Sequence, residues 1–379
     1  MDMNDYRSKI DRVDSELLRL FLDRMDTVGK IAEYKKENNL PVHNKSRERE
    51  ILGRVGEQSG QQMAGYSRIM FSNLFNLSRS YQKSIIAEEM PLARTIRRAL
   101  EDAPKLFPET GVVACQGVEG AYSQLACDKV FRYANIVYFK TFESVFQAVE
   151  QGLCEFGILP IENSTYGSVG AVYNLMKDYH FHIARSVKLK IDHVLLAQNG
   201  TKLEDVREIY SHEQALGQCS NFLREHPEIN IHVCENTAVA AQYVANLNRN
   251  DVAAISSRQC AELYGLSFLM DGFQDSENNF TRFICISRDL CIYPGANRIS
   301  IILTTPHEPG ALYDTISKFA ALGLNLTKLE SRPIMGRDFE FMFYFDFDAS
   351  LHSDDVVNLL GELSGGPELF IFLGNYSEV

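Results

Sequence analysis

The stretch that decides the fold reads Leu159-Pro160-Ile161-Glu162-Asn163-Ser164-Thr165-Tyr166-Gly167-Ser168-Val169. An apolar run, Phe156 to Leu159, leads into this polar turn. Such a run predicts a buried strand, and open α/β sheets bind ligands where the carboxyl ends of strands meet loops. A turn with helix-capping residues would have the same composition, because Asn and Ser are common caps. The stretch therefore predicts an α/β domain with a candidate ligand site at a strand end.

The same pattern recurs between residues 109 and 290. Further strand ends are Val112–Cys115 before the Gly-containing turn 116–123, Ile209-Tyr210 before Ser211, Val233-Cys234 before Asn236 and Thr237, and Ala253–Ile255 before Ser256 and Ser257. We expect Ser211 and Gln214 to form a capping box, and Asn236 to cap a helix. Alternating strands and helices predict two βα lobes, whose helix N-termini suit a dianion in the cleft between them.

Prolines mark the joins between three regions of different texture. Pro91, Pro104 and Pro108 mark the first join, and Pro294, within Tyr293-Pro294-Gly295, marks the second. We expect a helical domain at 1–90, a linker at 91–108, an α/β domain at 109–290 and a compact domain at 297–379.

Residues 1 to about 88 contain a seam of a long helix, spaced alternately four and three residues apart. It comprises Tyr6, Ile10, Val13, Leu17, Leu20, Arg24, Thr27 and Ile31. Arg24 places a cation on this seam, so it needs an anion, either a structural carboxylate or a ligand. Lys35 lies 11 residues further, close to three turns and about 16 Å away on the same face. Together they could bind a small dianion.

Arg7 lies about 25 Å from Arg24 along the same helix and on a different face, so it cannot reach that ligand. If Arg7 belongs to the site, it must come from a second chain. Three such helices also cannot bury their seams alone, which predicts an intertwined helical dimer. After Pro41, Asn44 or Ser46 can cap a second helix that carries Arg47 and Glu48 in its first turn. A third helix, about 62 to 88, places Ser78 and Gln82 on one face.

The last region reads βαββαβ, the ferredoxin-like order. Its clearest strand has Phe339, Phe341, Phe343, Phe345 and Phe347 in alternation with mostly polar residues. Pro309-Gly310-Ala311-Leu312 opens a helix, and Leu329-Glu330-Ser331-Arg332-Pro333 closes the next strand. Gly310 permits close backbone approach to a ligand. The alternative to a ligand site is a purely structural role, in which Gly310 only forms a turn and the charged residues of 329–333 only form a surface ion pair.

Composition excludes several classes of protein. The 379 residues carry 38 basic and 50 acidic side chains, and a net charge of −12 argues against general nucleic-acid binding. No apolar run approaches the roughly 20 residues needed to span a membrane, and residues 1 to 20 lack the apolar core of a secretory signal. The eight cysteines form no C-x-x-C pair, so we expect reduced thiols in a cytoplasmic protein without a metal site.

Taken together, these motifs resemble those of known enzyme families over essentially the whole chain. The first 90 residues resemble an all-helical chorismate mutase, because Arg7, Arg24, Lys35, Arg47, Glu48, Ser78 and Gln82 match that family's ligand-binding set in order and spacing. The stretch Pro160-Ile161-Glu162-Asn163-Ser164 and the motif Thr281-Arg282-Phe283 resemble prephenate dehydratase. The G-A-L and E-S-R-P segments resemble those of an ACT regulatory domain. The chain departs from these families at Asn44, often Asp, and at Gln116, usually Pro.

The resemblance implies a multidomain fold: an all-α chorismate mutase domain that forms an intertwined dimer, a two-lobed, periplasmic-binding-like α/β dehydratase domain and an α+β ferredoxin-like ACT domain. It implies a bifunctional isomerase and lyase of phenylalanine biosynthesis, which converts chorismate to prephenate and prephenate to phenylpyruvate. L-Phenylalanine would inhibit it at the ACT domain. The first reaction is a unimolecular rearrangement, so neither a nucleophile nor a cofactor is needed. We expect no cofactor and no metal, a homodimer or higher oligomer, and neither nucleic acid nor membrane as partner.

The resemblance also implies residue roles. Arg24 and the partner chain's Arg7 would hold two carboxylates, Lys35 and Gln82 would meet the ether oxygen, and Glu48 would accept from the ring hydroxyl. Asn44, Arg47 and Ser78 would complete that site. In the dehydratase, Thr281 would donate to the leaving hydroxyl, with Glu162 as the candidate that polarises it. The remaining expected substrate ligands are Asn163, Ser164, Ser211, Gln218, Thr237 and Arg282. The expected phenylalanine ligands are Gly310, Ala311, Leu312, Glu330, Ser331, Arg332 and Pro333.

Two alternative classes of protein share parts of this pattern. A mutase fused to a dehydrogenase would need a dinucleotide-binding fingerprint, and no G-x-G occurs in the chain. A non-catalytic amino-acid sensor, built from a two-lobed binding domain and an ACT domain, would explain residues 109–379. It would not explain the cations of residues 1–88.

Overall fold

The computed structural model describes residues 2–86, 90–334, 340–366 and 368–379. The chain divides into two compact units. One comprises the chain up to Arg98 with residues 305–323 and 352–368, and the other comprises residues 99–304, 324–351 and 369–379. Phe339, the first residue of the predicted alternating strand, lies outside the described residues.

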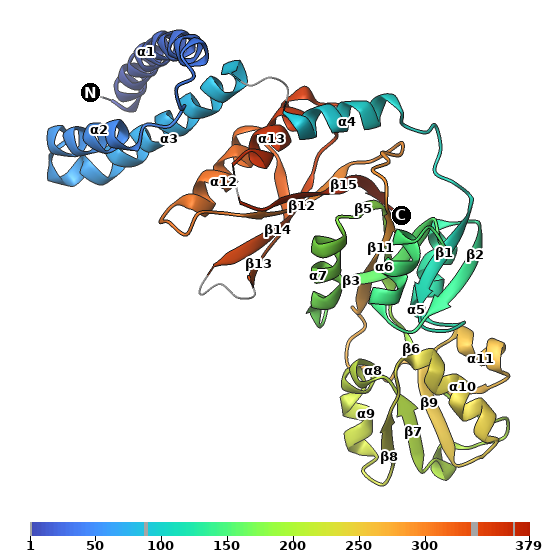
Figure 1. Cartoon of the computed structure of the whole chain (residues 1–379). Helices are drawn as coiled ribbons and strands as arrows, with labels where there is room; N and C mark the ends of the chain where they lie inside the picture. The colour runs from blue at the N-terminus through green and yellow to red at the C-terminus, as the bar shows by residue number, and fades with distance from the viewer. Residues whose placement is uncertain (1, 87–89, 335–339, 367) are drawn as a thin grey trace. The chain divides into compact units, whose positions relative to one another are not determined.

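The first unit is helical (Figure 1). Its helices are α1 (Met3–Glu37), α2 (Lys45–Gln58), α3 (Gly60–Ile86), α4 (Pro91–Glu101), α12 (Ala311–Ala321) and α13 (Asp354–Ser364). Both α1 and α2 pack on α3, which also contacts α13. Asn44 caps α2 by accepting a hydrogen bond from Arg47 N at 3.1 Å, which confirms the first of the two predicted caps. The third helix begins at Gly60, slightly earlier than predicted.

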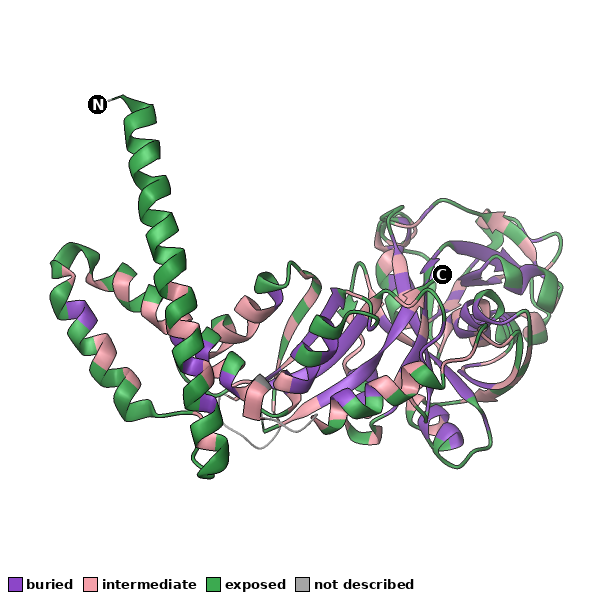
Figure 2. Cartoon of the chain, turned by 90° about the horizontal axis from the view of Figure 1, so that it is seen from above, coloured by how far each residue is buried: buried purple, intermediate pink, exposed green. Residues whose placement is uncertain are grey.

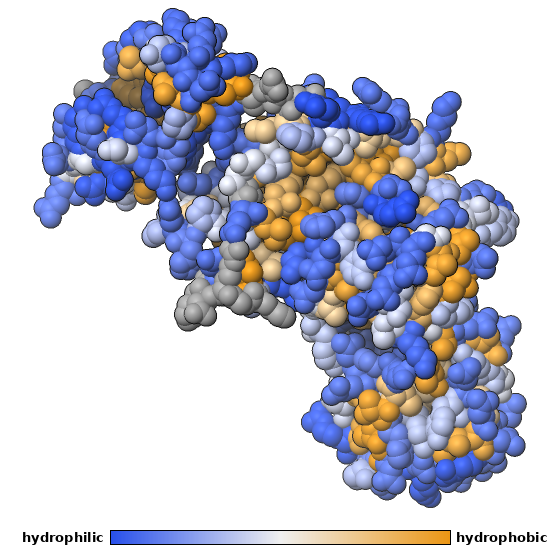
Figure 3. All heavy atoms as spheres, in the orientation of Figure 1, coloured by the Kyte–Doolittle hydropathy of each residue, from blue (hydrophilic) through white to orange (hydrophobic). Residues whose placement is uncertain are grey.

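Helix α1 leaves most of its apolar seam uncovered. Only Val28 and Ala32 are buried on it, whereas Ile10 is 60% exposed and Leu17 44% exposed. Figure 2 shows the N-terminal half of α1 as a projecting, exposed helix. Figure 3 shows apolar side chains among charged ones on helices α1 to α3. An exposed seam of this length costs free energy in water, so it calls for a covering surface.

The second unit contains two sheets. The larger has the order β13-β14-β12-β15-β5-β11-β3-β1-β2, with the short β4 (Gly167–Ser168) paired to β3. In its first lobe the strands are β1 (Thr110–Gln116), β2 (Tyr133–Phe139), β3 (Phe156–Asn163), β5 (His182–Lys190) and β11 (Phe280–Ser287). Helices α5 (Tyr122–Val130), α6 (Phe142–Glu150) and α7 (Gly170–Tyr179) belong to this lobe. Strand β3 is almost continuously apolar and buried as far as Leu159, as its sequence predicted.

The second lobe is a five-stranded sheet of order β10-β6-β9-β7-β8. Its strands are β6 (His193–Ala197), β7 (Glu208–Ser211), β8 (Asn230–Val233), β9 (Val252–Ser257) and β10 (Ser267–Met270). Its helices are η1 (Leu203–Asp205), α8 (Glu213–Gln218), α9 (Ser220–Glu225), α10 (Thr237–Leu247) and α11 (Gln259–Tyr264). Asn236 caps α10 as predicted, with Val239 N at 2.8 Å. The predicted Ser211–Gln214 capping box is wrong, because His212 is the cap of α8 and Ser211 is still in β7.

The C-terminal region follows the predicted βαββαβ order. Its strands are β12 (Arg298–Thr304), β13 (Asn325–Pro333), β14 (Phe341–Asp348) and β15 (Phe370–Glu378). They pair antiparallel in the order β13-β14-β12-β15, and β15 continues the sheet by pairing parallel with β5. One apolar core therefore runs across the joined sheet, and it includes Tyr173, Tyr344 and Tyr376.

Among the described residues, no helix combines the length and hydrophobicity needed to cross a bilayer.

Candidate active sites

The first cluster of site residues lies where α1 meets α3. Arg24 donates to Ser78 Oγ and, at 3.3 Å, to the carbonyl oxygen of Leu74. Burial lowers the pKa of Arg24, although a guanidinium remains charged at any physiological pH. The sequence left open a structural carboxylate as the partner of Arg24, and among the described residues no carboxylate forms a hydrogen bond or ion pair with it. A half-buried guanidinium held by neutral oxygens still has charge available for an anion.

One turn along α3, Lys35 and Gln82 form the second contact of this cluster. Lys35 Nζ donates to Gln82 Oε1 at 2.9 Å and to the carbonyl oxygen of Val42 at 2.6 Å. Burial is the main cause that lowers the pKa of Lys35, and the charge of Glu48 partly opposes that shift. Gln82 is only 7% exposed, and its amide nitrogen contacts Ser78 O at 3.3 Å. Both side chains thus present donors on the same side of the helix pair.

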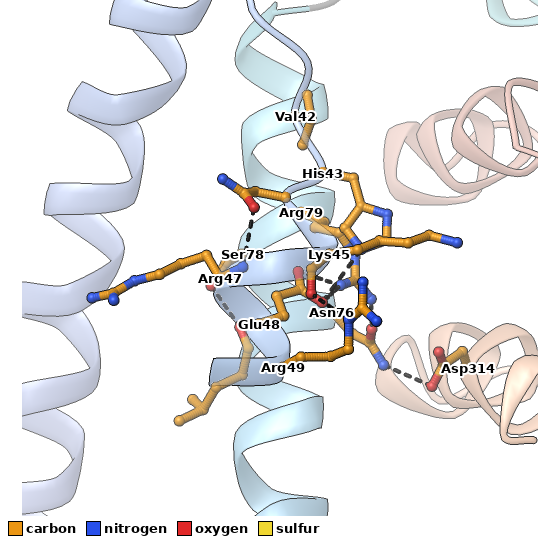
Figure 4. A network of polar contacts seen from close by, with 12 residues as sticks. Val42, His43, Lys45, Arg47, Glu48, Arg49, Asn76, Ser78, Arg79 and Asp314 are labelled. Carbon is orange, nitrogen blue, oxygen red and sulfur yellow. Dashed lines mark hydrogen bonds and ion pairs between the residues drawn. The ribbon is translucent and has the colours of Figure 1, made fainter. Parts of the chain in front are cut away.

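Glu48 is held in place by a residue that the sequence did not single out. Arg79 Nη1 contacts both carboxylate oxygens of Glu48, at 2.5 and 2.6 Å, while Arg79 Nη2 donates to Asn76 Oδ1. Asn76 in turn donates to Asp314 on α12 at 2.8 Å. Figure 4 shows this chain of contacts from α2 through α3 to α12. No spacing rule distinguishes Arg79 from an ordinary surface arginine, so only the fold identifies it.

The other expected mutase residues lie outside the contacts made by this cluster. Asn44 serves as the cap of α2, and Arg47 pairs with Glu50 at 2.7 Å on an exposed surface. Arg7 is exposed near the start of α1, more than four turns before Arg24. The chain therefore does not bring Arg7 to its own Arg24, as the helix geometry required.

The second site is built on neighbouring strands β3 and β11. Asn163 Nδ2 donates to Thr281 Oγ1 and to Asn279 Oδ1, each at 2.9 Å. Asn163 Oδ1 accepts from Thr165 N and Tyr166 N, both at 2.9 Å, so the orientation of the amide is fixed. Because Thr281 Oγ1 accepts a hydrogen bond, the hydroxyl proton of Thr281 remains available for donation. Asn279 Nδ2 is buried with no hydrogen-bond partner among the described residues.

Glu162 is not the partner of Thr281, which corrects the expectation from the sequence. In the β3–β11 register, Thr281 is paired with Asn163 and Arg282 with Glu162. Successive side chains of a strand face opposite sides of the sheet, so Glu162 and Arg282 lie on the face away from Thr281. Glu162 contacts Arg282 at 3.3 Å and Lys328 at 3.1 Å.

Arg282 is a buried member of a charged cluster rather than an open carboxylate receptor. It pairs with Asp346 at 2.6 Å, and Asp346 also accepts from Ser300 at 2.6 Å. Burial opposes the charge on Arg282, but Tyr376, Asp346 and Tyr173 together raise its pKa. The expected role of Arg282 as a substrate ligand therefore has no support in this geometry, since its charge is already neutralised.

The second lobe contributes fewer exposed groups than the sequence predicted. Ser211 is fully buried and donates to the carbonyl oxygen of Ile255 at 2.6 Å, so this geometry gives no support to its expected role as a substrate ligand. Gln218 Oε1 lies 2.7 Å from His193 Nε2. Burial lowers the pKa of His193 and also that of His212. Neutral histidines here would act as hydrogen-bond partners rather than as cations.

Two further expected substrate ligands, Thr237 and Ser164, differ in their surroundings. Thr237 is 8% exposed at the start of α10, and Ser164 Oγ donates to Asn278 O at 2.9 Å and accepts from Phe280 N at the same distance. The lobes also touch directly: Ser257 donates to Gly120 O at 3.1 Å, and Tyr166 donates to Gln214 O at 3.3 Å. The last two hydrogen bonds join the two lobes, whereas those of Ser164 connect the turn after β3 to the start of β11.

The E-S-R-P segment on β13 contacts the turn that follows β3. Glu330 accepts from Ser168 and pairs with Lys328 at 3.2 Å and Arg332 at 2.9 Å. Burial would raise the pKa of Glu330, but the hydrogen bond from Ser168 and the cations of Lys328 and Arg332 outweigh burial and lower it. Ser331 and Pro333 are exposed on the same strand. Gly310, Ala311 and Leu312 belong to the other compact unit, where Gly310 has a positive φ and precedes α12.

Comparison with known proteins identifies both parts of the chain. The prephenate dehydratase family matches residues 113–290, and chorismate mutase type II matches residues 6–83. Arogenate dehydratase/prephenate dehydratase 2 of Arabidopsis thaliana is 38% identical over 276 residues, which is 70% of this chain and 72% of that relative. The chain belongs to the prephenate dehydratase family.

One relative in this family matches along nearly the whole chain. The bifunctional chorismate mutase/prephenate dehydratase of Aquifex aeolicus is 29% identical over 377 residues, which is 99% of this chain and 98% of that relative. Among solved structures, a prephenate dehydratase from Arthrobacter aurescens in complex with L-Phe has a TM-score of 0.64 and 28% identity. It covers 71% of this chain and 89% of its own. This chain thus carries a chorismate mutase domain ahead of its prephenate dehydratase domain.

Proposed function

We propose that the chain catalyses two consecutive reactions, the rearrangement of chorismate to prephenate and the conversion of prephenate to phenylpyruvate. The observation that carries the proposal is that each family domain assembles its own polar cluster. Arg24, Ser78, Lys35 and Gln82 meet in the helical unit, and Asn163 meets Thr281 in the second unit. These reactions place the protein in phenylalanine biosynthesis.

The mutase step needs orientation and charge more than covalent chemistry. Arg24 would bind one carboxylate, while Lys35 and the Gln82 amide would stabilise the ether oxygen as its bond breaks. The second carboxylate would be bound by Arg7 of a second copy, whose exposed α1 seam would cover the seam described above. Two copies would thereby complete two shared sites, and this pairing supports an intertwined homodimer.

The dehydratase step needs a proton for the leaving hydroxyl and room for carbon dioxide. Thr281 would donate that proton, and Asn163 would hold Thr281 Oγ1 in the rotamer that directs its hydrogen into the cleft. Asn163 also offsets charge that develops on the threonine oxygen, as any donor to an oxyanion does. Asn279 Nδ2 and Gln218 remain as further hydrogen-bonding groups for the substrate.

The C-terminal region would be the regulatory part. The strand order β13-β14-β12-β15 is that of a ferredoxin-like ACT domain, and the G-A-L and E-S-R-P segments would bind L-phenylalanine. The contacts of Glu330 with Ser168 and of Lys328 with Glu162 then give inhibitor binding a physical route to strand β3. The two-lobed cleft would close on its substrate as periplasmic-binding folds do. The cytoplasmic location stays a prediction.

The test is incubation of purified protein with chorismate, followed by measurement of phenylpyruvate absorbance in alkali. Formation of phenylpyruvate supports the enzyme, whereas saturable phenylalanine binding without turnover of chorismate or prephenate supports the non-catalytic sensor. A parallel assay with arogenate is needed, because several relatives are named for that substrate. The mutase domain favours prephenate, since it would supply prephenate to the same molecule.

A further inference from the structure

A cavity of about 610 Å³ opens within the first compact unit, between α3, α4, α12 and α13. Part of its wall is apolar, formed by Leu77, Ala93 and Leu359. Polar and charged groups, among them Lys83 and Lys318, form the rest. Cavities of about 300–1,000 Å³ with mixed walls and a few convergent polar groups are typical of small-molecule sites.

The cavity lies on a different face of α3 from the Arg24–Ser78 and Lys35–Gln82 contacts, although Asn76, a partner of Arg79, also lines it. At about 100° per residue, Ser80 lies about 200° around the helix from Ser78, and Lys83 lies about 100° from Gln82. Helix α3 therefore presents the Arg24 partner on one face and the cavity on the other. The G-A-L segment, which comprises the N-cap Gly310 and the first two residues of α12, is not part of the cavity lining.

The two lysines that line the cavity differ in their partners. Lys318 pairs with Glu362 at 2.8 Å, and Ser80 donates to the same carboxylate at 2.8 Å. Lys83, by contrast, pairs with no carboxylate in the part of the chain that the structure describes. Burial is the main cause that lowers the pKa of Lys83; Lys318 and Arg79 act in the same direction, and the charge of Glu362 partly opposes them. A half-buried ammonium without a counterion is costly, and a bound anion would relieve that cost.

We propose that this cavity binds a small aryl carboxylate, with the carboxylate at Lys83 and the ring against Leu77, Ala93 and Leu359. The apolar wall suits a ring, and the unpaired cation suits an acid. An ammonium group on the ligand would be repelled by the cations of Lys83 and Lys318. The carboxylate of Glu362 already pairs with Lys318, and that of Asp355 is exposed to solvent. The site therefore favours an aryl acid over the corresponding amino acid.

The test uses the absence of tryptophan from the chain. Leu322 is 40% exposed and lines the cavity, so Leu322→Trp places one local fluorescent reporter there in the full-length protein. The probe is 3-phenylpropanoate, which carries the ring and carboxylate without an amino group. Ligand that binds near Asn163 and Thr281 should not change the emission of this tryptophan, because those residues belong to the other compact unit.

We expect a saturable change in tryptophan emission on titration with 3-phenylpropanoate. Lys83→Met in the same background should weaken the apparent affinity at least tenfold, and Lys83→Arg should retain it because the charge remains. Lys129→Met, an exposed residue of α5, is the matched control and should have no effect. Isothermal titration of the tryptophan-free protein and its Lys83→Met variant, both checked by circular dichroism, repeats the comparison without the reporter.

Three results would overturn the proposal. They are the absence of a saturable change, equal affinity in Lys83→Met and the parent, and a response to L-phenylalanine with none to 3-phenylpropanoate. The last result would mean that binding requires the ammonium group.

Discussion

Asn163 Nδ2 lies 2.9 Å from Thr281 Oγ1, whereas Glu162, its neighbour in sequence, contacts Arg282 and Lys328 on the other face of the sheet. The alternation of side chains along β3 thus separates a residue that can act on the threonine from one that cannot. The proposed proton donation by Thr281 would therefore rest on the Asn163 amide and not on the Glu162 carboxylate.

Replacement of Asn163 by Ala should lower the kcat of prephenate dehydration by about 10²-fold, the usual effect of losing a donor that stabilises developing charge on oxygen. Glu162→Gln should cost less than Thr281→Ala, because Glu162 does not touch Thr281. Steady-state rates with added prephenate measure both effects, and urea unfolding of each variant checks that the second unit still folds. Equal losses in Glu162→Gln and Thr281→Ala would restore Glu162 as the polarising group.

Arg24→Ala should abolish mutase activity and spare the conversion of added prephenate, since the two clusters lie in different compact units. Mixing Arg24→Ala with Arg7→Ala should restore about a quarter of the parental mutase rate, because half of the dimers are mixed and each mixed dimer has one intact shared site. The measurement is mutase rate after subunit exchange, with exchange confirmed by native mass spectrometry. Failure to complement in exchanged samples argues against shared sites.

The mutase should lose activity at alkaline pH because of Lys35. Burial lowers the pKa of this ammonium, so it is charged below that pKa and becomes neutral as the pH rises through it. The kcat/KM for chorismate should therefore fall at a lower pH than an ordinary lysine would cause. Lys35→Arg should move that fall to higher pH, since a guanidinium keeps its charge. An identical pH profile in Lys35→Arg would show that another group titrates.

Asp346→Asn should destabilise the second unit by about 3 kcal/mol, because it leaves the buried Arg282 without its closest anion. The side chain of Asp346 is 7% exposed, and its partner Arg282 is 11% exposed. Asp348→Asn, on the same strand but 52% exposed, is the matched control and should change the unfolding free energy by less than about 1 kcal/mol. Urea unfolding of both variants measures the difference. Equal midpoints would mean that the Arg282 pair contributes little.

Glu330→Ala should raise the L-phenylalanine concentration for half-inhibition of the dehydratase by about tenfold, more than it changes uninhibited turnover. The reason is that Glu330 joins β13 to Ser168, and it also pairs with Lys328 on the same strand, which in turn contacts Glu162 of β3. Ser331→Ala should act in the same direction, and Glu150→Ala, exposed on α6, serves as the control. Parental inhibition curves in both β13 variants would remove this segment from regulation.

The local parts of the fold could be predicted because they depend on neighbours in sequence. The Asn44 and Asn236 caps, the buried run before Asn163 and the βαββαβ order follow from side-chain period and capping chemistry. The register of β3 against β11 could not be predicted, because a shift of one residue exchanges the two faces. That register decides whether Asn163 or Glu162 meets Thr281.

The sequence by itself determined the succession of helical, α/β and βαββαβ regions and the separation of Arg7 from Arg24, since periodicity and helix rise act along the chain. Only the tertiary structure decided which groups pair. Arg79 holds Glu48, Asp346 neutralises Arg282, and Ser211 bonds to a backbone carbonyl, all across long intervals of sequence. Such contacts depend on distances between elements, and no local pattern of residues encodes those distances.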